Sequence, residues 1–124
     1  MTNKTSWTTL ISTLFFFLIC SAPTTNLVAA EDHASIIKQG KKIAFSRKKG
    51  NCLACHAIEG GSLPGNIGPP LINMRDRYPD KEQLHAQIWN ATSYNATSIM
   101  PPFGKHEILT RDELDKVVEF VYSL

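Results

Sequence analysis

The sequence feature that most constrains the fold is Cys52-Leu-Ala-Cys55-His56, in which a histidine directly follows the second of two closely spaced cysteines. Three kinds of chemistry use a cysteine pair at this spacing: a thiol–disulfide redox pair, half of a zinc site, and covalent attachment of a haem. Each makes a different demand on the rest of the chain. The surrounding sequence therefore has to distinguish between them.

The redox and zinc interpretations lack the sequence context that they need. A thioredoxin-like pair lies near a βαβ pattern, and strand-like alternation of apolar residues is missing from this sequence. A structural zinc ion takes four ligands, often from a second cysteine pair or two closely spaced histidines. His33, His85 and His106 are too scattered to supply them.

The third interpretation, covalent haem attachment, fits the motif. In C-x-x-C-H sequences both thiols form thioethers with the haem, and the histidine becomes a ligand of the iron. One short turn can present two sulfurs to the ring edge and direct an imidazole toward its centre. We therefore expect one covalently bound haem c, with Cys52 and Cys55 as thioethers and His56 as the proximal iron ligand.

A six-coordinate iron needs a second ligand, for which Met100 is the favoured candidate. It lies in Ser-Ile-Met-Pro-Pro-Phe-Gly, residues 98–104, where two prolines restrict the backbone of a non-helical loop. Met74 is flanked by charged residues and is interpreted as a surface residue or the start of a helix. Ligation by His106 and an open coordination position are also considered. A histidine–methionine pair raises the reduction potential, which suits electron transfer.

The proline-rich segment Gly-Pro-Pro-Leu, residues 68–71, is expected to lie beside the haem. The backbone carbonyl of Pro69 could accept a hydrogen bond from His56, which would orient the imidazole and increase its basicity. Leu71 is expected to pack on the haem plane. The alternative is a surface loop without a role in the pocket.

The start of the chain resembles an export signal. Lys4 precedes an apolar stretch of about a dozen residues, and Val-Ala-Ala at 28–30 offers the small residues of a cleavage site. A retained membrane anchor is disfavoured because spanning a bilayer takes about 20 apolar residues. Lipid attachment at Cys20 is disfavoured because Ile19 precedes it.

We therefore expect a cleaved signal peptide at residues 1–30 and one haem-carrying domain at residues 31–124. Cys52 and Cys55 are then the cysteines of the mature chain, which would lie in the periplasm. A domain of this size buries little surface when it folds and commonly needs an additional stabilising link, such as a disulfide or a bound metal. A covalently attached cofactor would provide such a link.

Helical patterns occupy three segments. Residues 33–48 carry apolar side chains at helical spacing, with Gly40 inside the pattern as a sign of close approach by another helix. A second helix is expected after Asp80, with Leu84 and Ile88 in the core, and the third begins after Thr110. Its apolar stripe is Leu114, Val117, Val118 and Val121. Glycine- and proline-rich loops separate these segments, so we expect an all-α fold of about three main helices around one haem.

Five sequence segments together resemble class I c-type cytochromes and, more narrowly, the SoxX family, the small monohaem subunits of SoxAX cytochromes. In chain order they are GNCLACHAI, PGNIGPPL, RYPD, IWNAT and SIMPPFGKHEILT. The resemblance implies that residues 31–124 are a cytochrome c domain, with a class I fold and crossing terminal helices. One departure is Ala44, which stands where a helix-one aromatic is usual, with Phe45 next. The terminal helix crossing could be adjusted there.

The resemblance further implies the electron-accepting subunit of a heteromeric L-cysteine S-thiosulfotransferase. In that family the larger partner, SoxA, carries the catalytic haem, and the complex oxidatively couples thiosulfate to a cysteine of the carrier SoxYZ. Electrons then pass to an acceptor such as a small cytochrome. The resemblance implies no nucleic-acid partner and no catalytic residue in this chain. The alternative is a free monohaem cytochrome that shuttles electrons.

Overall fold

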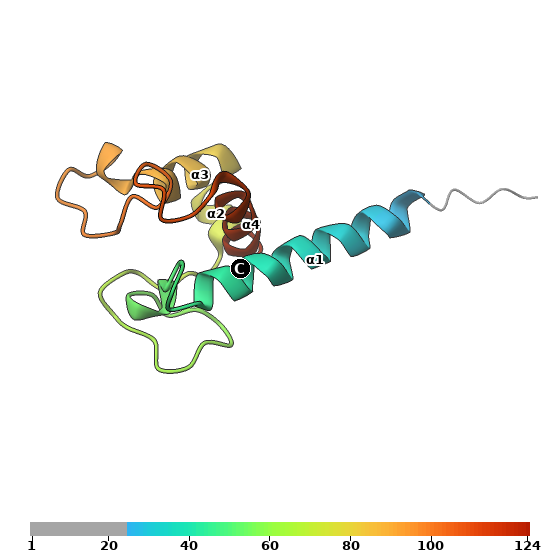
Figure 1. The fold of residues 1–124 in the computed structure, drawn as a ribbon, viewed down its shortest axis with the longest axis horizontal. Coiled ribbons are helices and arrows are strands. Elements are labelled where there is room, and N and C mark those ends of the chain that lie inside the picture. Colours follow the sequence, from blue (N-terminus) through green and yellow to red (C-terminus); the bar gives the residue numbers. More distant parts are fainter. Residues whose placement is uncertain (1–24) are drawn as a thin grey trace, which may run out of the picture.

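The computed structural model describes residues 25–124, which form an all-α arrangement of helices and loops (Figure 1). The elements are α1 (Thr25–Phe45), the 3-10 helix η1 (Cys52–Ala54), α2 (Met74–Arg77), α3 (Lys81–Trp89), the 3-10 helix η2 (Ala91–Ser93) and α4 (Arg111–Tyr122). The expected all-α class is confirmed. The predicted signal peptide at 1–30 lies largely outside the described residues and stays a prediction.

Within residues 25–124, no helix is both long enough and apolar enough to cross a membrane. The hydrophobic core instead gathers where α1, α3 and α4 meet. Its most enclosed members are Ala44, Met74, Leu84, Leu114 and Val117, each at most 2% exposed. This core lies directly beneath the loops that carry the candidate site.

Helices α1 and α4 cross (Figure 1), and Gly40 lies at the crossing, as the sequence predicted. A Cβ atom placed on Gly40 would lie 1.9 Å from the carbonyl oxygen of Lys116 and 2.9 Å from the Cβ of Phe120. Neither distance is compatible with a side chain at this position. Gly40 therefore lowers the helix propensity of α1 but lets the backbones of α1 and α4 approach each other.

We expect Gly40→Ala to destabilise the protein by about 3 kcal/mol, because the added methyl group overpacks a backbone contact. Intrinsic helix propensity alone predicts the opposite sign, since alanine is favoured over glycine by about 1 kcal/mol. Denaturant unfolding measures the difference. The exposed neighbour Gln39→Ala is the control, and a stabilised Gly40→Ala protein would contradict the close crossing.

Helix α1 begins before the predicted range 33–48 and ends earlier, at Phe45. The helix stops because the backbone turns: the N–H groups of Lys49 and Asn51 both donate to the carbonyl of Ser46 at 3.0 Å. Asn51 then adopts a left-handed conformation, with φ of 48°. This compact turn leads the chain directly into Cys52.

The departure at Ala44 is accommodated by Phe45. Ala44 is completely buried, and the Phe45 ring meets the Phe120 ring edge-on, with centroids 5.9 Å apart and an interplanar angle of 81°. Edge-to-face packing is a favourable aromatic geometry. Ala44 thus packs closely in the core, and the adjacent Phe45 makes the aromatic contact with Phe120.

Helices α3 and α4 form as their sequence patterns indicate. Asp80 caps α3 by accepting a hydrogen bond from the N–H of Glu82 at 3.0 Å, and Leu84 and Ile88 are buried. Thr110 and Glu113 form the predicted capping box of α4, with reciprocal bonds of 3.1 and 3.2 Å. Both helix starts are therefore encoded locally.

Glu113 also ties the start of α4 to the turn before Cys52. Its carboxylate lies 2.9 Å from Nζ of Lys49, and this hydrogen bond, followed by that from the Thr110 backbone, lowers the pKa of Glu113 below its ordinary value. A lowered carboxyl pKa stabilises the fold above the unfolded pKa of about 4.3 and loses that effect as pH falls.

We expect Glu113→Gln to reduce the unfolding free energy at neutral pH by about 0.5 kcal/mol, the scale of a solvent-exposed pair. Glutamine retains the capping geometry, so the variant isolates the charge. Denaturation at a series of pH values should show wild type and variant converging below about pH 4. Curves that stay separated in acid would place the effect in the cap rather than in the charge.

Candidate functional site

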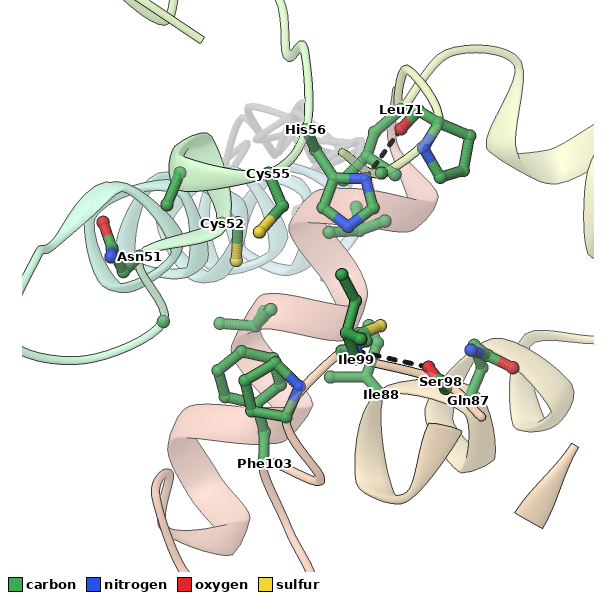
Figure 2. A pocket seen from close by; sticks show the side chains of 18 of the residues that line it. Asn51, Cys52, Cys55, His56, Leu71, Gln87, Ile88, Ser98, Ile99 and Phe103 are labelled. Carbon is green, nitrogen blue, oxygen red and sulfur yellow. Dashed lines mark hydrogen bonds between the residues drawn. The ribbon is translucent and has the colours of Figure 1, made fainter. Parts of the chain in front are cut away.

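A single cavity of about 630 Å³ brings together all the candidate site residues (Figure 2). It opens between the η1 turn, the 68–71 segment, α3, the 98–103 loop and the inner face of α4. Cys52, Cys55, His56, Pro69, Leu71 and Met100 all line it. Residues as far apart in the sequence as Cys52 and Met100 thus line the same cavity.

The η1 turn presents the two cysteines. The N–H groups of Cys55 and His56 both donate to the carbonyl of Cys52, at 3.2 and 2.9 Å, which closes a tight turn. Figure 2 shows both sulfur atoms on the side of the turn that faces the cavity. Burial raises the pKa of the Cys52 thiol to about 11. Redox-active C-x-x-C pairs have lowered pKa values instead, so this environment does not favour thiolate redox chemistry.

The imidazole of His56 is held by the backbone of Pro69. Nδ1 of His56 lies 2.6 Å from the Pro69 carbonyl oxygen, and the ring points into the cavity (Figure 2). A carbonyl can only accept, so Nδ1 carries the hydrogen and the lone pair of Nε2 is free. This is the contact expected from the sequence, and it gives the imidazole the tautomer that a metal ligand needs.

The 68–71 segment is fastened alongside the motif by two further backbone bonds. The N–H of Gly68 donates a hydrogen bond to the backbone carbonyl of Cys55 at 2.8 Å, and the N–H of Leu71 donates to the backbone carbonyl of Ala57 at 2.9 Å. Gly68 lies under the His56 ring, so a Cβ atom there would be 2.4 Å from Cε1. Only glycine lets the segment pass this close to the imidazole.

We expect Gly68→Ala to turn the His56 ring out of position, because its methyl group would overlap the ring while Pro69 holds Nδ1. The ferric protein should become partly high-spin in its visible spectrum and bind added imidazole. The control is Asn66→Ala, an exposed change in the same loop. A low-spin Gly68→Ala protein would show that the ring is less constrained than the contacts imply.

The Met100 loop supplies the opposite wall of the cavity. Ile99, Ser98 and Phe103 lie across the space from His56 and the two cysteines (Figure 2). The N–H of Met100 donates to Oγ of Ser98 at 3.3 Å, and its side chain is half-buried. Met100 is therefore on the wall where a second iron ligand is expected, although its role as that ligand stays a prediction.

The competing ligand candidates are placed differently. His33 and His106 are exposed and do not line the cavity, and His85 borders a separate hollow between α3 and α4. Met74 does line the cavity and is 2% exposed, so its interpretation as a surface residue is wrong. Its interpretation as a helix start is confirmed, since α2 begins there.

Met74 is buried because α2 packs against the chain end. The N–H of Met74 donates to the carbonyl of Leu124 at 3.0 Å. Its sulfur accepts from Nη1 of Arg77 at 3.2 Å, and the same nitrogen donates to the carbonyl of Pro70 at 2.8 Å. Sequence reasoning missed this arrangement, because charged neighbours conceal a buried thioether.

The rest of the cavity wall is largely apolar. Sequence reasoning assigned core roles, but no site role, to Leu84, Ile88, Val117 and Val121, and assigned nothing to Phe103 or Leu109. The apolar stripes of α3 and α4 were visible in the sequence. Which residues of each stripe line the cavity was not.

The donor set suits a haem. One turn provides two thiols and an imidazole, a thioether lies on the opposite wall, and the volume is within the range of about 300 to 1,000 Å³ that ligand pockets have. In the described part of the chain, histidine, cysteine and acidic side chains form no cluster of three or more that could hold a metal ion. The zinc interpretation thus gains no structural support.

Comparison with known proteins gives two findings. A family model described as Cytochrome c matches residues 37–124. The chain is also similar to a protein named "Uncharacterized lipoprotein" from Aquifex aeolicus (strain VF5), with 31% identity over 94 residues. That match covers 72% of this chain and 46% of the relative, so the chain spans about half of the length of the protein it matches.

Proposed function

This chain belongs to the cytochrome c family, and from that premise we propose that it is the electron-transfer subunit of a SoxAX-type complex in thiosulfate oxidation. Membership of the family makes it an electron-transfer haem protein. The observation that supports electron transfer is that His56 and Met100 line one cavity together with Cys52 and Cys55, and that Ser98 and Ile99, which precede Met100 in its loop, lie across this cavity from His56 (Figure 2).

When bound, the haem supplies an iron that can gain and lose one electron. The chain's own residues would hold it: Cys52 and Cys55 would attach it, Nε2 of His56 and the sulfur of Met100 would bind the iron, and apolar side chains would keep water away. An iron bound by two protein side chains would favour electron transfer over activation of small molecules.

The SoxAX assignment rests on the amino-acid sequences and the chain order of the five segments that resemble SoxX. Coupling thiosulfate to a carrier cysteine forms one sulfur–sulfur bond and releases two electrons, which a one-electron centre passes on singly. The bond-forming chemistry belongs to SoxA in this proposal, because Cys52 and Cys55 are the cysteines of residues 31–124 and both are used for attachment.

The partners in this proposal are SoxA, in a heterodimer, and the carrier SoxYZ. A small cytochrome in the periplasm is the downstream acceptor. The alternative is a free electron shuttle. It is favoured by Arg47 and Lys48, exposed cations near the motif, of which Arg47 borders the cavity. Such charges could steer an acidic redox partner to the site.

The test is purification of the full-length, affinity-tagged chain from its own host grown on thiosulfate, followed by native mass measurement. A second cytochrome recovered in a one-to-one ratio supports the proposal. A monomer that carries haem but no partner supports the free shuttle. Addition of thiosulfate and SoxYZ should reduce the haem only in the heterodimeric preparation.

A further inference from the structure

The Met100 loop needs an external anchor, because its own backbone can supply few hydrogen bonds. Pro101 and Pro102 carry no N–H groups, and Met100 itself donates only to a serine side chain, at 3.3 Å. Fixed proline φ angles stiffen the segment. A constraint applied at Gly104 is therefore transmitted through a short, stiff segment to the thioether.

One backbone anchor outside the loop is the last residue of α3, in addition to the bonds that His106 and Leu109 donate to the carbonyls of Pro102 and Phe103. The carbonyl of Trp89 accepts hydrogen bonds from the N–H groups of both Gly104 and Lys105, at 3.2 and 3.1 Å. Carbonyls in the last turn of a helix have no partner within the helix. The end of α3 and the loop thus satisfy each other's backbone groups.

The indole ring of Trp89 adds a second contact at the same point. Gly104 is buried against it so closely that a Cβ atom on Gly104 would lie 2.0 Å from Cε3 and 2.4 Å from Cδ2. The glycine backbone therefore lies directly on the indole. A side chain at residue 104 and an indole at residue 89 could not both keep their positions.

Trp89 is itself held on its exposed side. The His85 ring stacks on it with centroids 6.2 Å apart and an interplanar angle of 14°, and the Arg111 guanidinium lies 6.0 Å from its centre. Trp89 does not line the large cavity, whereas its neighbour Ile88 does. Any effect of the indole on the haem would therefore have to act through the loop.

We propose that Trp89 is a positioning residue that holds the thioether of Met100 at the iron by clamping the loop at Gly104. The inference rests on the proposed role of Met100 as second iron ligand. The new element is that Trp89 determines how firmly Met100 is held as a ligand. It does not depend on which partner protein receives the electrons.

The first experiment measures displacement of the thioether by imidazole in the haem-loaded ferric protein. Trp89→Leu keeps the backbone carbonyl but removes the indole, so the loop should open more readily. We expect half-displacement at about tenfold lower imidazole concentration, the factor that corresponds to about 1.4 kcal/mol of loop opening. The sulfur-to-iron charge-transfer band is the readout.

Two control variants separate positioning from general stability. Val118→Ala removes buried volume from α4 at a residue that does not line the cavity, and it should lower the unfolding free energy without changing the imidazole titration. His85→Ala removes the ring that stacks on Trp89 but leaves the contact between Trp89 and the Met100 loop in place. If Val118→Ala shifts the titration as much as Trp89→Leu, Trp89 has only a structural role and the proposal is overturned.

A double substitution tests the contact itself. Gly104→Ala alone should shift the imidazole titration in the same direction as Trp89→Leu, because its methyl group meets the indole. Added to Trp89→Leu, the same change should cost little more, since space is then available. Fully additive shifts would contradict the clamp. A wild-type protein without the charge-transfer band would also overturn it, whereas failure to recover SoxA would affect only the proposed function.

Discussion

Replacing both Cys52 and Cys55 by serine is expected to give a colourless and largely unfolded protein. Serine cannot form the thioethers that retain the haem, and the 630 Å³ cavity would lose its occupant. The apolar walls that pack against the haem would then be exposed to water, and unfilled volume in a core destabilises a fold. A small domain has an unfolding free energy of only about 5–15 kcal/mol, so the loss of its cofactor is expected to unfold it.

The measurements are visible absorbance and far-ultraviolet circular dichroism of the purified protein. The control is Ala54→Ser, which adds a hydroxyl to the same turn at an exposed residue and should leave colour and helicity intact. A double-serine protein that remained helical without haem would show that the helical core is sufficient for folding. The account of the haem as a structural staple would then be wrong.

Met100→Ala should abolish the sulfur-to-iron charge-transfer band and lower the reduction potential. The thioether favours ferrous iron relative to other axial donors. Its loss should shift the potential by a quantity of the order of 0.1 V, a fraction of the roughly 0.8 V range that axial ligands span. Near-infrared absorbance and a redox titration measure the two effects.

Met74→Leu is the matched variant, because Met74 is the other methionine that lines the cavity. Its sulfur is engaged by Arg77, and leucine occupies a similar volume. We expect this variant to retain the band and a near-normal potential. The reverse pattern, with the band lost in Met74→Leu and kept in Met100→Ala, would reassign the distal ligand.

Features encoded by neighbouring residues could be predicted from the sequence. The capping box at Thr110 and the cap at Asp80 are local hydrogen-bond patterns, and both are present. The C-x-x-C-H motif is equally local, and the contact between His56 and Pro69 followed from the need to orient an imidazole. Gly40 was informative because a glycine within a helix costs stability unless another backbone lies against it.

Features that depend on tertiary packing could not be predicted in the same way. Met74 is flanked by charged residues, yet it is buried because the chain end at Leu124 folds over α2. The contact between Trp89 and Gly104 joins two segments with no shared sequence pattern. The early end of α1 likewise depends on the turn at residues 46–51, whose hydrogen bonds replace the last helical turn expected from the apolar spacing.

We expect this cytochrome c family domain to carry one haem joined covalently through Cys52 and Cys55. Mass spectrometry of the exported, denatured wild-type protein tests it most directly, because denaturation releases any haem that is held without covalent bonds. We predict the mass of the polypeptide from Glu31 to Leu124 plus one haem. A bare polypeptide mass, with haem recovered free in solution, would contradict the account.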